Sequence, residues 1–169
     1  MKGQDSRYTT ILSQNSPFDI REAYGILRAN LQFESLANNL KSVLITSAQP
    51  MDGKSTVAIN LAVTMAASGK KVLLIDADLR RPCTHKYLKV KSVPGLTNWL
   101  VNDVELEHMI TETKHGFDLL PSGPIPPNPS ELLSIEKMDR LMKQAEEEYD
   151  FVIVDSPPAG LMADAAILS

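Results

Sequence analysis

The sequence lacks the features that mark several large classes of protein. Cys83 is the only cysteine among 169 residues, which excludes an intramolecular disulfide and a cysteine-rich metal or iron–sulfur site. No window approaches the roughly 18 consecutive apolar residues of a membrane span, and the amino-terminal stretch has no signal-peptide pattern. The formal net charge of −4 supplies no basic footprint, so a role in nucleic-acid binding has little electrostatic support. These absences favour a reducing, cytosolic setting without direct membrane insertion.

The composition is that of an ordinary globular protein, with 43% hydrophobic and 22% charged residues. The length suits one domain, because domains of roughly 100 to 150 residues are the commonest. Residues 1–16 are polar and aperiodic and predict a flexible leader. We therefore expect one domain over residues 17–169.

Apolar spacing predicts that helices and strands alternate along the chain. Helical spacing is found in three long segments: 18–38, 55–68 and 130–148. Ser130 is the expected cap of the last segment. Short apolar runs predict four strands: 41–46, 71–76, 117–120 and 150–154. Residues 97–113 predict one or two short helices, and the proline-rich segment 121–129 predicts an extended loop. The pattern indicates an α/β fold, with a parallel sheet covered by helices on both faces.

The segment AQPMDGKST has the spacing of a P-loop and stands between a predicted strand and a predicted helix. Its residues, all candidates for phosphate binding, are Ala48, Gln49, Pro50, Met51, Asp52, Gly53, Lys54, Ser55 and Thr56. In such a loop the backbone N–H groups and the helix N-terminus point at one anionic centre, while Lys54 adds a positive charge and Ser55 a hydroxyl for Mg²⁺. The segment predicts binding of a nucleoside triphosphate, ATP with Mg²⁺. A chance GK[ST] triplet is the alternative, and the strand–loop–helix context argues against it.

Three aspartates stand where predicted strands end. Asp76 and Asp78 lie at and just beyond the end of one strand, and Asp155 follows another. The carboxyl ends of parallel strands share one edge, so these acids should face the same crevice as the P-loop. There they would hold Mg²⁺ directly or through water and orient the attacking group. Asp76 alone could equally form a turn or cap a helix, but three acids around one P-loop weaken that alternative.

The motifs AQPMDGKST, VLLIDADLR and FVIVDSPP occur in this order, with PSGPIPPNPSELL before the last. Together they resemble the bacterial tyrosine kinases that control capsule and exopolysaccharide synthesis, and the likeness covers about residues 21–169. The resemblance implies a P-loop NTPase fold with Walker A, A′ and B motifs. It implies ATP binding at Lys54, Ser55 and Thr56, and metal and acceptor-hydroxyl roles for Asp76 and Asp78.

The same resemblance gives roles to two further residues and implies partners. Asp155 would support Mg²⁺, and Arg80 would either contact phosphate or cap a helix. Members of the family are cytosolic kinase domains switched on by the cytoplasmic tail of a transmembrane polysaccharide co-polymerase. They form rings whose subunits phosphorylate one another on a C-terminal tyrosine cluster. The implied location is the cytoplasm, peripheral to the membrane through that partner, and the implied substrates are protein tyrosines.

The sequence departs from this family in three places. Met51 replaces a glycine, and a glycine-like φ there would cost on the order of 1 kcal/mol. Gly25 replaces one arginine of the motif in segment 18–38, which weakens a homo-oligomer built through that helix. The sequence ends at Ser169, after the fourth predicted strand, where the family continues through further strands and a tyrosine-rich tail.

Two other functions compete with a protein-tyrosine kinase. The first is an inactive, truncated remnant that binds the co-polymerase or a kinase partner, and nucleotide titration would distinguish it. The second is a partition-type P-loop ATPase. Those ATPases carry a second lysine at the position of Gln49, so the glutamine argues against this function.

Overall fold

The computed structural model describes residues 11–133 and 136–159. Within these residues the strands form one sheet, in the order β1 (Ser42–Ile45), β5 (Phe151–Asp155), β2 (Val72–Asp76), β4 (Asp118–Leu120) and β3 (Thr111–Glu112). The first four run parallel, and β3 pairs antiparallel with β4. The four predicted strands are confirmed. The predicted parallel sheet is also confirmed. The antiparallel strand β3 is an addition at its edge, and two residues are too few to leave a pattern in the sequence.

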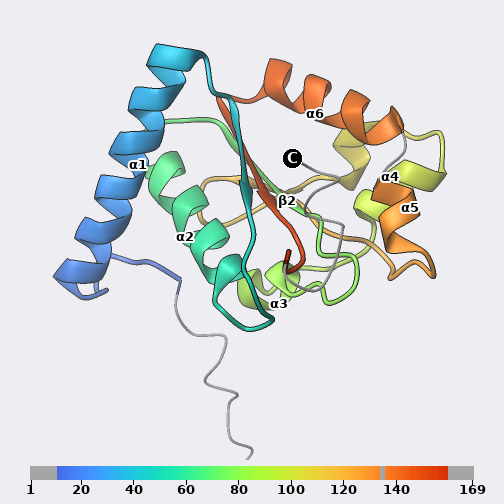
Figure 1. Ribbon diagram of the computed structural model, residues 1–169, viewed down its shortest axis with the longest axis horizontal. Coiled ribbons are helices and arrows are strands. Elements are labelled where there is room, and N and C mark those ends of the chain that lie inside the picture. Colours follow the sequence, from blue (N-terminus) through green and yellow to red (C-terminus); the bar gives the residue numbers. More distant parts are fainter. Residues whose placement is uncertain (1–10, 134–135, 160–169) are drawn as a thin grey trace, which may run out of the picture.

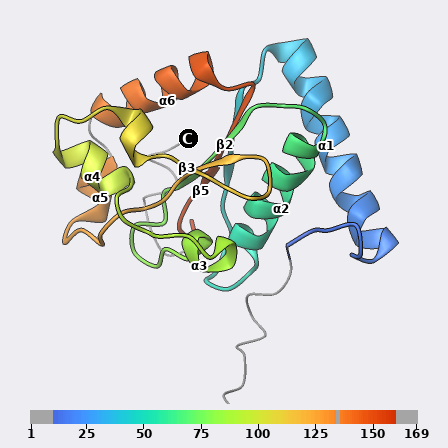
Figure 2. The same cartoon turned by 180° about the vertical axis from the view of Figure 1, so that it is seen from behind.

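Helices cover both faces of this sheet, as predicted. The helices are α1 (Phe18–Asn38), α2 (Lys54–Ala67), α3 (Thr84–Leu88), α4 (Leu96–Val101), the 3₁₀ helix η2 (Leu106–Met109), α5 (Pro129–Leu133) and α6 (Glu136–Glu148). Figures 1 and 2 show α1 and α2 on one side of the sheet and α4, α5 and α6 on the other. Among the described residues, no helix has both the length and the apolar composition required to cross a membrane.

The helix expected over 130–148 is instead two helices, α5 and α6, which run in different directions (Figure 1). The residues between them, 134–135, lie outside the described residues. Ser130 lies inside the first turn of α5 rather than before it, because the helix begins at Pro129, whose missing N–H and fixed φ suit a first helical turn. The short helix α3 has no counterpart among the predicted elements, since five residues carry too little periodicity.

The buried strands divide their side chains between two hydrophobic clusters. Leu73 and Ile75 of β2 face the cluster formed with α4, α5 and α6. Leu74 of β2 and Ile153 of β5 face the other cluster, with α2. Successive residues of a strand point to opposite faces, so strands that are apolar throughout require a helical layer on each side. This is why β2 and β5 are buried along their whole length.

Helix α1 lies outside α2 and is only partly covered. Leu27 and Leu31 pack against the cluster around α2, yet no residue of α1 is fully buried. Its outward side chains include Phe18, Phe33 and Leu36, which are 71%, 69% and 88% exposed. An apolar surface of this kind is a common sign of an interaction site.

The segment before α1 is held to the body of the protein. Leu12 donates its backbone N–H to Asn60 Oδ1 of α2 at 2.9 Å, and Ile11 packs against the same cluster as α2. Ile11 and Leu12 of the expected flexible leader therefore have tertiary contacts. Residues 1–10 of that leader lie outside the described residues.

The sheet brings the candidate residues to one edge. In the register of β2 and β5, Asp76 lies opposite Asp155, and Ile45 at the end of β1 also pairs with Asp155. The P-loop leaves β1 at this same end. Three sequence motifs thus converge because their strands are parallel neighbours.

Candidate functional site

The P-loop connects β1 to α2 and takes its shape from internal hydrogen bonds. The backbone N–H of Gln49 donates to Asp52 Oδ2 at 2.9 Å, and the Ser47 hydroxyl donates to the Gln49 carbonyl at 2.7 Å. Gly53 has φ +90° immediately before α2, in the left-handed region that glycine adopts without strain. Met51 has φ +70°, in the same left-handed region, although it carries a Cβ.

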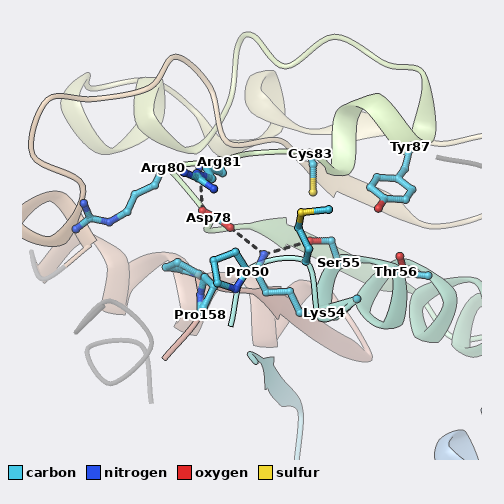
Figure 3. Close-up of a pocket in the computed structure, with 13 residues that line it drawn as sticks. Pro50, Lys54, Ser55, Thr56, Asp78, Arg80, Arg81, Cys83, Tyr87 and Pro158 are labelled. Atoms are coloured by element: carbon cyan, nitrogen blue, oxygen red, sulfur yellow. Dashed lines mark hydrogen bonds and ion pairs between the residues drawn. The ribbon is translucent and has the colours of Figure 1, made fainter. Parts of the chain in front are cut away.

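Lys54 joins the three motifs. Its Nζ lies 2.8 Å from Asp78 Oδ2 and donates to the Ser55 hydroxyl at 3.2 Å (Figure 3). The same Nζ lies 3.5 Å from Asp155 Oδ1. Burial acts to lower the pKa of Lys54, but the nearby charges of Asp155 and Asp78 outweigh it, and the pKa is raised. The lysine is therefore a fixed positive charge at the helix N-terminus.

Asp76 and Asp155 are fully buried, which disfavours their ionised forms. Burial first, and then the charge of Asp155, raise the pKa of Asp76 to about 7. Burial is also the main reason that the pKa of Asp155 is raised to about 6, with Lys54 acting in the opposite direction. Thr84 donates to Asp76 Oδ2 from its hydroxyl at 2.5 Å and its N–H at 3.3 Å. Asp76 Oδ1 and Asp155 Oδ2 have no hydrogen-bond partner among the described residues.

The oxygen atoms at this site fit a magnesium ion that binds together with phosphate. Ser55, Asp78 and Asp155 offer a hydroxyl and two carboxylates, and Asp155 Oδ2 is a buried oxygen that needs a partner. Mg²⁺ is usually held by one or two carboxylates, with substrate phosphates and water completing its coordination. No group of three His, Cys, Asp or Glu side chains in the described part of the chain could hold a metal ion. The arrangement therefore suits a metal–nucleotide complex better than a free metal ion.

A cavity of about 490 Å³ opens in front of Lys54. Its wall includes most of the candidate residues: Pro50, Met51, Gly53, Lys54, Ser55, Thr56, Asp78 and Arg80. Five candidates lie outside its lining: Ala48, Gln49, Asp52, Asp76 and Asp155. Of these, Asp52 shapes the loop through Gln49, and Asp155 contacts Lys54. Asp76 is buried opposite Asp155 in the sheet.

Arg80 contacts helix α5. Its Nη2 donates to the Ser130 hydroxyl at 2.7 Å. Figure 3 shows the arginine side chain extending away from Lys54. The arginine lines the cavity, but this contact ties it to the first turn of α5 and not to the P-loop.

Five residues that line the cavity were not among the sequence candidates: Arg81, Cys83, Tyr87, Pro157 and Pro158. The prolines belong to FVIVDSPP, so their place after a buried strand could have identified them. Tyr87 also packs against the cluster around α2. Burial raises the pKa of the Cys83 thiol to about 11, so the thiol stays protonated. For Arg81 and Cys83, the only indication in the sequence is that they follow the DADLR motif closely.

The sequence matches the AAA domain family over residues 41–169. The chain is 50% identical to the tyrosine-protein kinase YwqD of Bacillus subtilis over 149 residues, which cover 87% of this chain and 62% of YwqD. The chain thus spans less than two thirds of that relative's length.

Solved structures give the same relationship in three dimensions. The kinase domain of Escherichia coli tyrosine kinase ETK superposes with a TM-score of 0.84 at 39% identity, covering 94% of this chain and 66% of the ETK domain. The septum site-determining protein MinD from Pyrococcus horikoshii, complexed with Mg-ADP, superposes with a TM-score of 0.65 at 30% identity, covering 76% and 53%. The fold is therefore shared with a tyrosine kinase domain and with a protein solved in complex with Mg-ADP.

Proposed function

Because the chain belongs to the bacterial tyrosine kinase family of P-loop proteins, we propose that it is an ATP-dependent protein-tyrosine kinase. The observation that carries the proposal is the position of Lys54, which reaches Asp78 of one motif and Asp155 of another from the P-loop. The family resemblance assigns its process as capsule or exopolysaccharide synthesis.

The roles proposed for individual residues follow from their positions. Residues 48–56 cradle the phosphates through backbone N–H groups, with Arg80 at the cavity wall and Lys54 stabilising charge on the transferred phosphoryl group. Asp78 faces the cavity, so it contacts the acceptor hydroxyl, and Asp76 is buried two residues before it, held by Thr84. Ser55, Asp78 and Asp155 would hold Mg²⁺, which when bound would neutralise phosphate charge.

The chemistry is an in-line displacement. The tyrosine oxygen forms a bond to the γ-phosphorus as the bond from that phosphorus to the β–γ bridging oxygen breaks, and ADP leaves. The phenolic proton passes to a carboxylate at Asp78. Lys54 stays charged because its acid neighbours raise its pKa, and this keeps a positive charge beside the oxygens that gain negative charge.

The test is phosphotyrosine formation by the purified chain with ATP, Mg²⁺ and a tyrosine-bearing protein, with and without the co-polymerase tail. We expect phosphotyrosine that disappears in Lys54→Met. Nucleotide titration runs in parallel. Nucleotide binding without any transfer would reject the kinase activity, and absence of both would support the inactive remnant.

The proposed partners are the cytoplasmic tail of a transmembrane polysaccharide co-polymerase, protein tyrosines and further copies of this chain. Such a partner would place the protein in the cytoplasm at the membrane surface. Helix α1 is the proposed homo-oligomer surface, since Phe33 and Leu36 are exposed on it. A Cβ at Gly25 would meet no atom within 4 Å, so an arginine fits there without rebuilding the helix. Gly25→Arg should therefore increase the oligomer fraction in sizing experiments.

A partition-type ATPase is the second candidate, favoured by the similarity to MinD. Gln49 lies outside the cavity lining and offers no cationic side chain where those ATPases place a lysine. ATP-dependent dimerisation together with phosphate release in the absence of an acceptor would support this function over the kinase.

A further inference from the structure

A second hollow, an open groove of about 550 Å³, adjoins the P-loop cavity. We call it the basic groove. One wall is formed by residues of the segment 81–86 and the other by Ser92, Val93 and the segment 123–125. Of these residues, only Arg81 and Cys83 also line the P-loop cavity.

The far wall of the basic groove is held rigidly by backbone contacts. Gly123 donates its N–H to the Ser92 carbonyl at 3.0 Å, and Leu96 donates to the Pro121 carbonyl at 2.7 Å. Gly95 lies between these bonds, and a Cβ there would overlap the backbone at Pro121 and Gly123. The close approach of the two segments preforms the wall, which lowers the entropy cost of binding a partner.

The charge of the groove is opposite to that of the whole chain. Arg81 and Lys86 are exposed cations on the near wall, and the lining contains no Asp or Glu. Neither cation forms an ion pair within the described part of the chain. Burial and the neighbouring Lys86 lower the pKa of His85, so the histidine adds no charge at neutral pH. A chain with net charge −4 thus presents a local site for anionic groups.

The opposite wall is apolar, which argues for a peptide over a small anion. Val93 is 48% exposed and Ile125 is 64% exposed, and both line the groove beside Pro124. An extended peptide can place acidic side chains on one wall and apolar groups on the other. Free phosphate would use only the cations.

The groove also leads to the proposed site of phosphoryl transfer. Arg81 and Cys83 line both the groove and the P-loop cavity. The backbone N–H of Arg81 donates to Asp78 Oδ1 at 3.0 Å, so the groove begins next to the carboxylate that faces the cavity. Figure 3 shows Cys83 and Arg81 on the side of the cavity opposite Pro158.

We propose that the basic groove binds a tyrosine-bearing peptide segment of another protein through acidic residues flanking the tyrosine, which then reaches Asp78. The proposal rests on the proposed kinase function and adds a substrate class to it. Arg81 and Lys86 pair with the acidic residues, and Val93 and Ile125 contact the apolar part of the segment.

The experiment uses the full chain and three labelled peptides that carry one tyrosine flanked by glutamates, by glutamines or by lysines. Binding is measured by fluorescence anisotropy with a non-hydrolysable ATP analogue, and transfer is measured separately with ATP. The variants are Lys86→Glu and, as a matched control, Lys143→Glu on the exposed face of α6. Thermal unfolding checks that both variants fold.

We expect the glutamate peptide to bind about tenfold more tightly than the glutamine peptide. Lys86→Glu should abolish this preference and favour the lysine peptide, whereas Lys143→Glu should retain it. Equal binding of the glutamate and glutamine peptides, or an unchanged preference in Lys86→Glu, would overturn the groove proposal even if transfer occurs. Preference lost in Lys86→Glu without transfer to any peptide would support the groove and reject the kinase function.

Discussion

The P-loop cavity and the basic groove meet at Arg81 and Cys83, but their cationic side chains have different surroundings. In the cavity, Lys54 pairs with acids that are buried in the sheet edge. In the groove, the cations stand on an exposed wall and have no acidic partner in the described part of the chain. Buried pairs couple the cavity to the stability of the fold, whereas exposed cations affect mainly what binds.

Removing the cavity's cation should have the largest effect. Lys54→Met leaves Asp78 and Asp155 without their counter-ion, which should destabilise the fold by about 3 kcal/mol and weaken nucleotide binding roughly 100-fold. Chemical unfolding and titration with a fluorescent ATP analogue measure the two quantities. Lys86→Glu is the comparison variant in the groove and should leave stability within about 0.5 kcal/mol. Equal destabilisation by the two variants would remove the distinction between the sites.

The far wall of the basic groove should be sensitive to added side-chain volume rather than to charge. Gly95→Ala forces a Cβ into the backbone at Pro121, which should cost about 2–3 kcal/mol and weaken peptide binding. Gly25→Ala is the matched control, because a Cβ meets open space there and alanine favours a helix by roughly 1 kcal/mol. Urea unfolding compares both variants with the parent chain. A harmless Gly95→Ala would mean that the wall is flexible.

The two sites differed in how far the sequence could predict them. The P-loop, the strand-end aspartates and the strands that carry them follow from local patterns, because a parallel sheet places the carboxyl ends of its strands together. The basic groove unites Lys86, Val93 and Ile125 from three separate segments. The bond between Gly123 and Ser92 that joins two of them leaves no periodic signal. The partners of Lys54 were predictable as a set, but the buried contact of Asp76 with Thr84 was not.

The buried aspartates beside the cavity should also make the stability of the fold depend on pH. In the unfolded chain aspartate has a pKa near 3.9, and in the folded chain burial raises the pKa of Asp155 to about 6 and that of Asp76 to about 7. The folded state therefore binds more protons between these values, and stability falls as pH rises from about 4 to about 7. Without Mg²⁺ we expect the Tm at pH 8 to lie at least about 4 °C below that at pH 5.

Asp76→Asn should reduce this pH dependence, because asparagine cannot ionise and its carbonyl can still accept the hydrogen bond from Thr84. Thermal unfolding of both chains across pH 4–8 gives the comparison. A parent chain whose Tm rises steadily over this range would contradict the buried, protonated state of these acids.

The smallest expected effect concerns strain in the P-loop. Met51 has φ +70° and is 83% exposed, so its side chain gains little from packing while its backbone is strained. Met51→Gly removes a cost of about 1 kcal/mol, partly offset by the greater freedom of glycine in the unfolded chain. If the strained geometry is the one that binds phosphate, nucleotide affinity should rise about threefold while peptide binding in the groove stays the same. Titration of both ligands on one preparation measures this difference, and weaker nucleotide binding would show that Met51 holds the loop in place through its side chain.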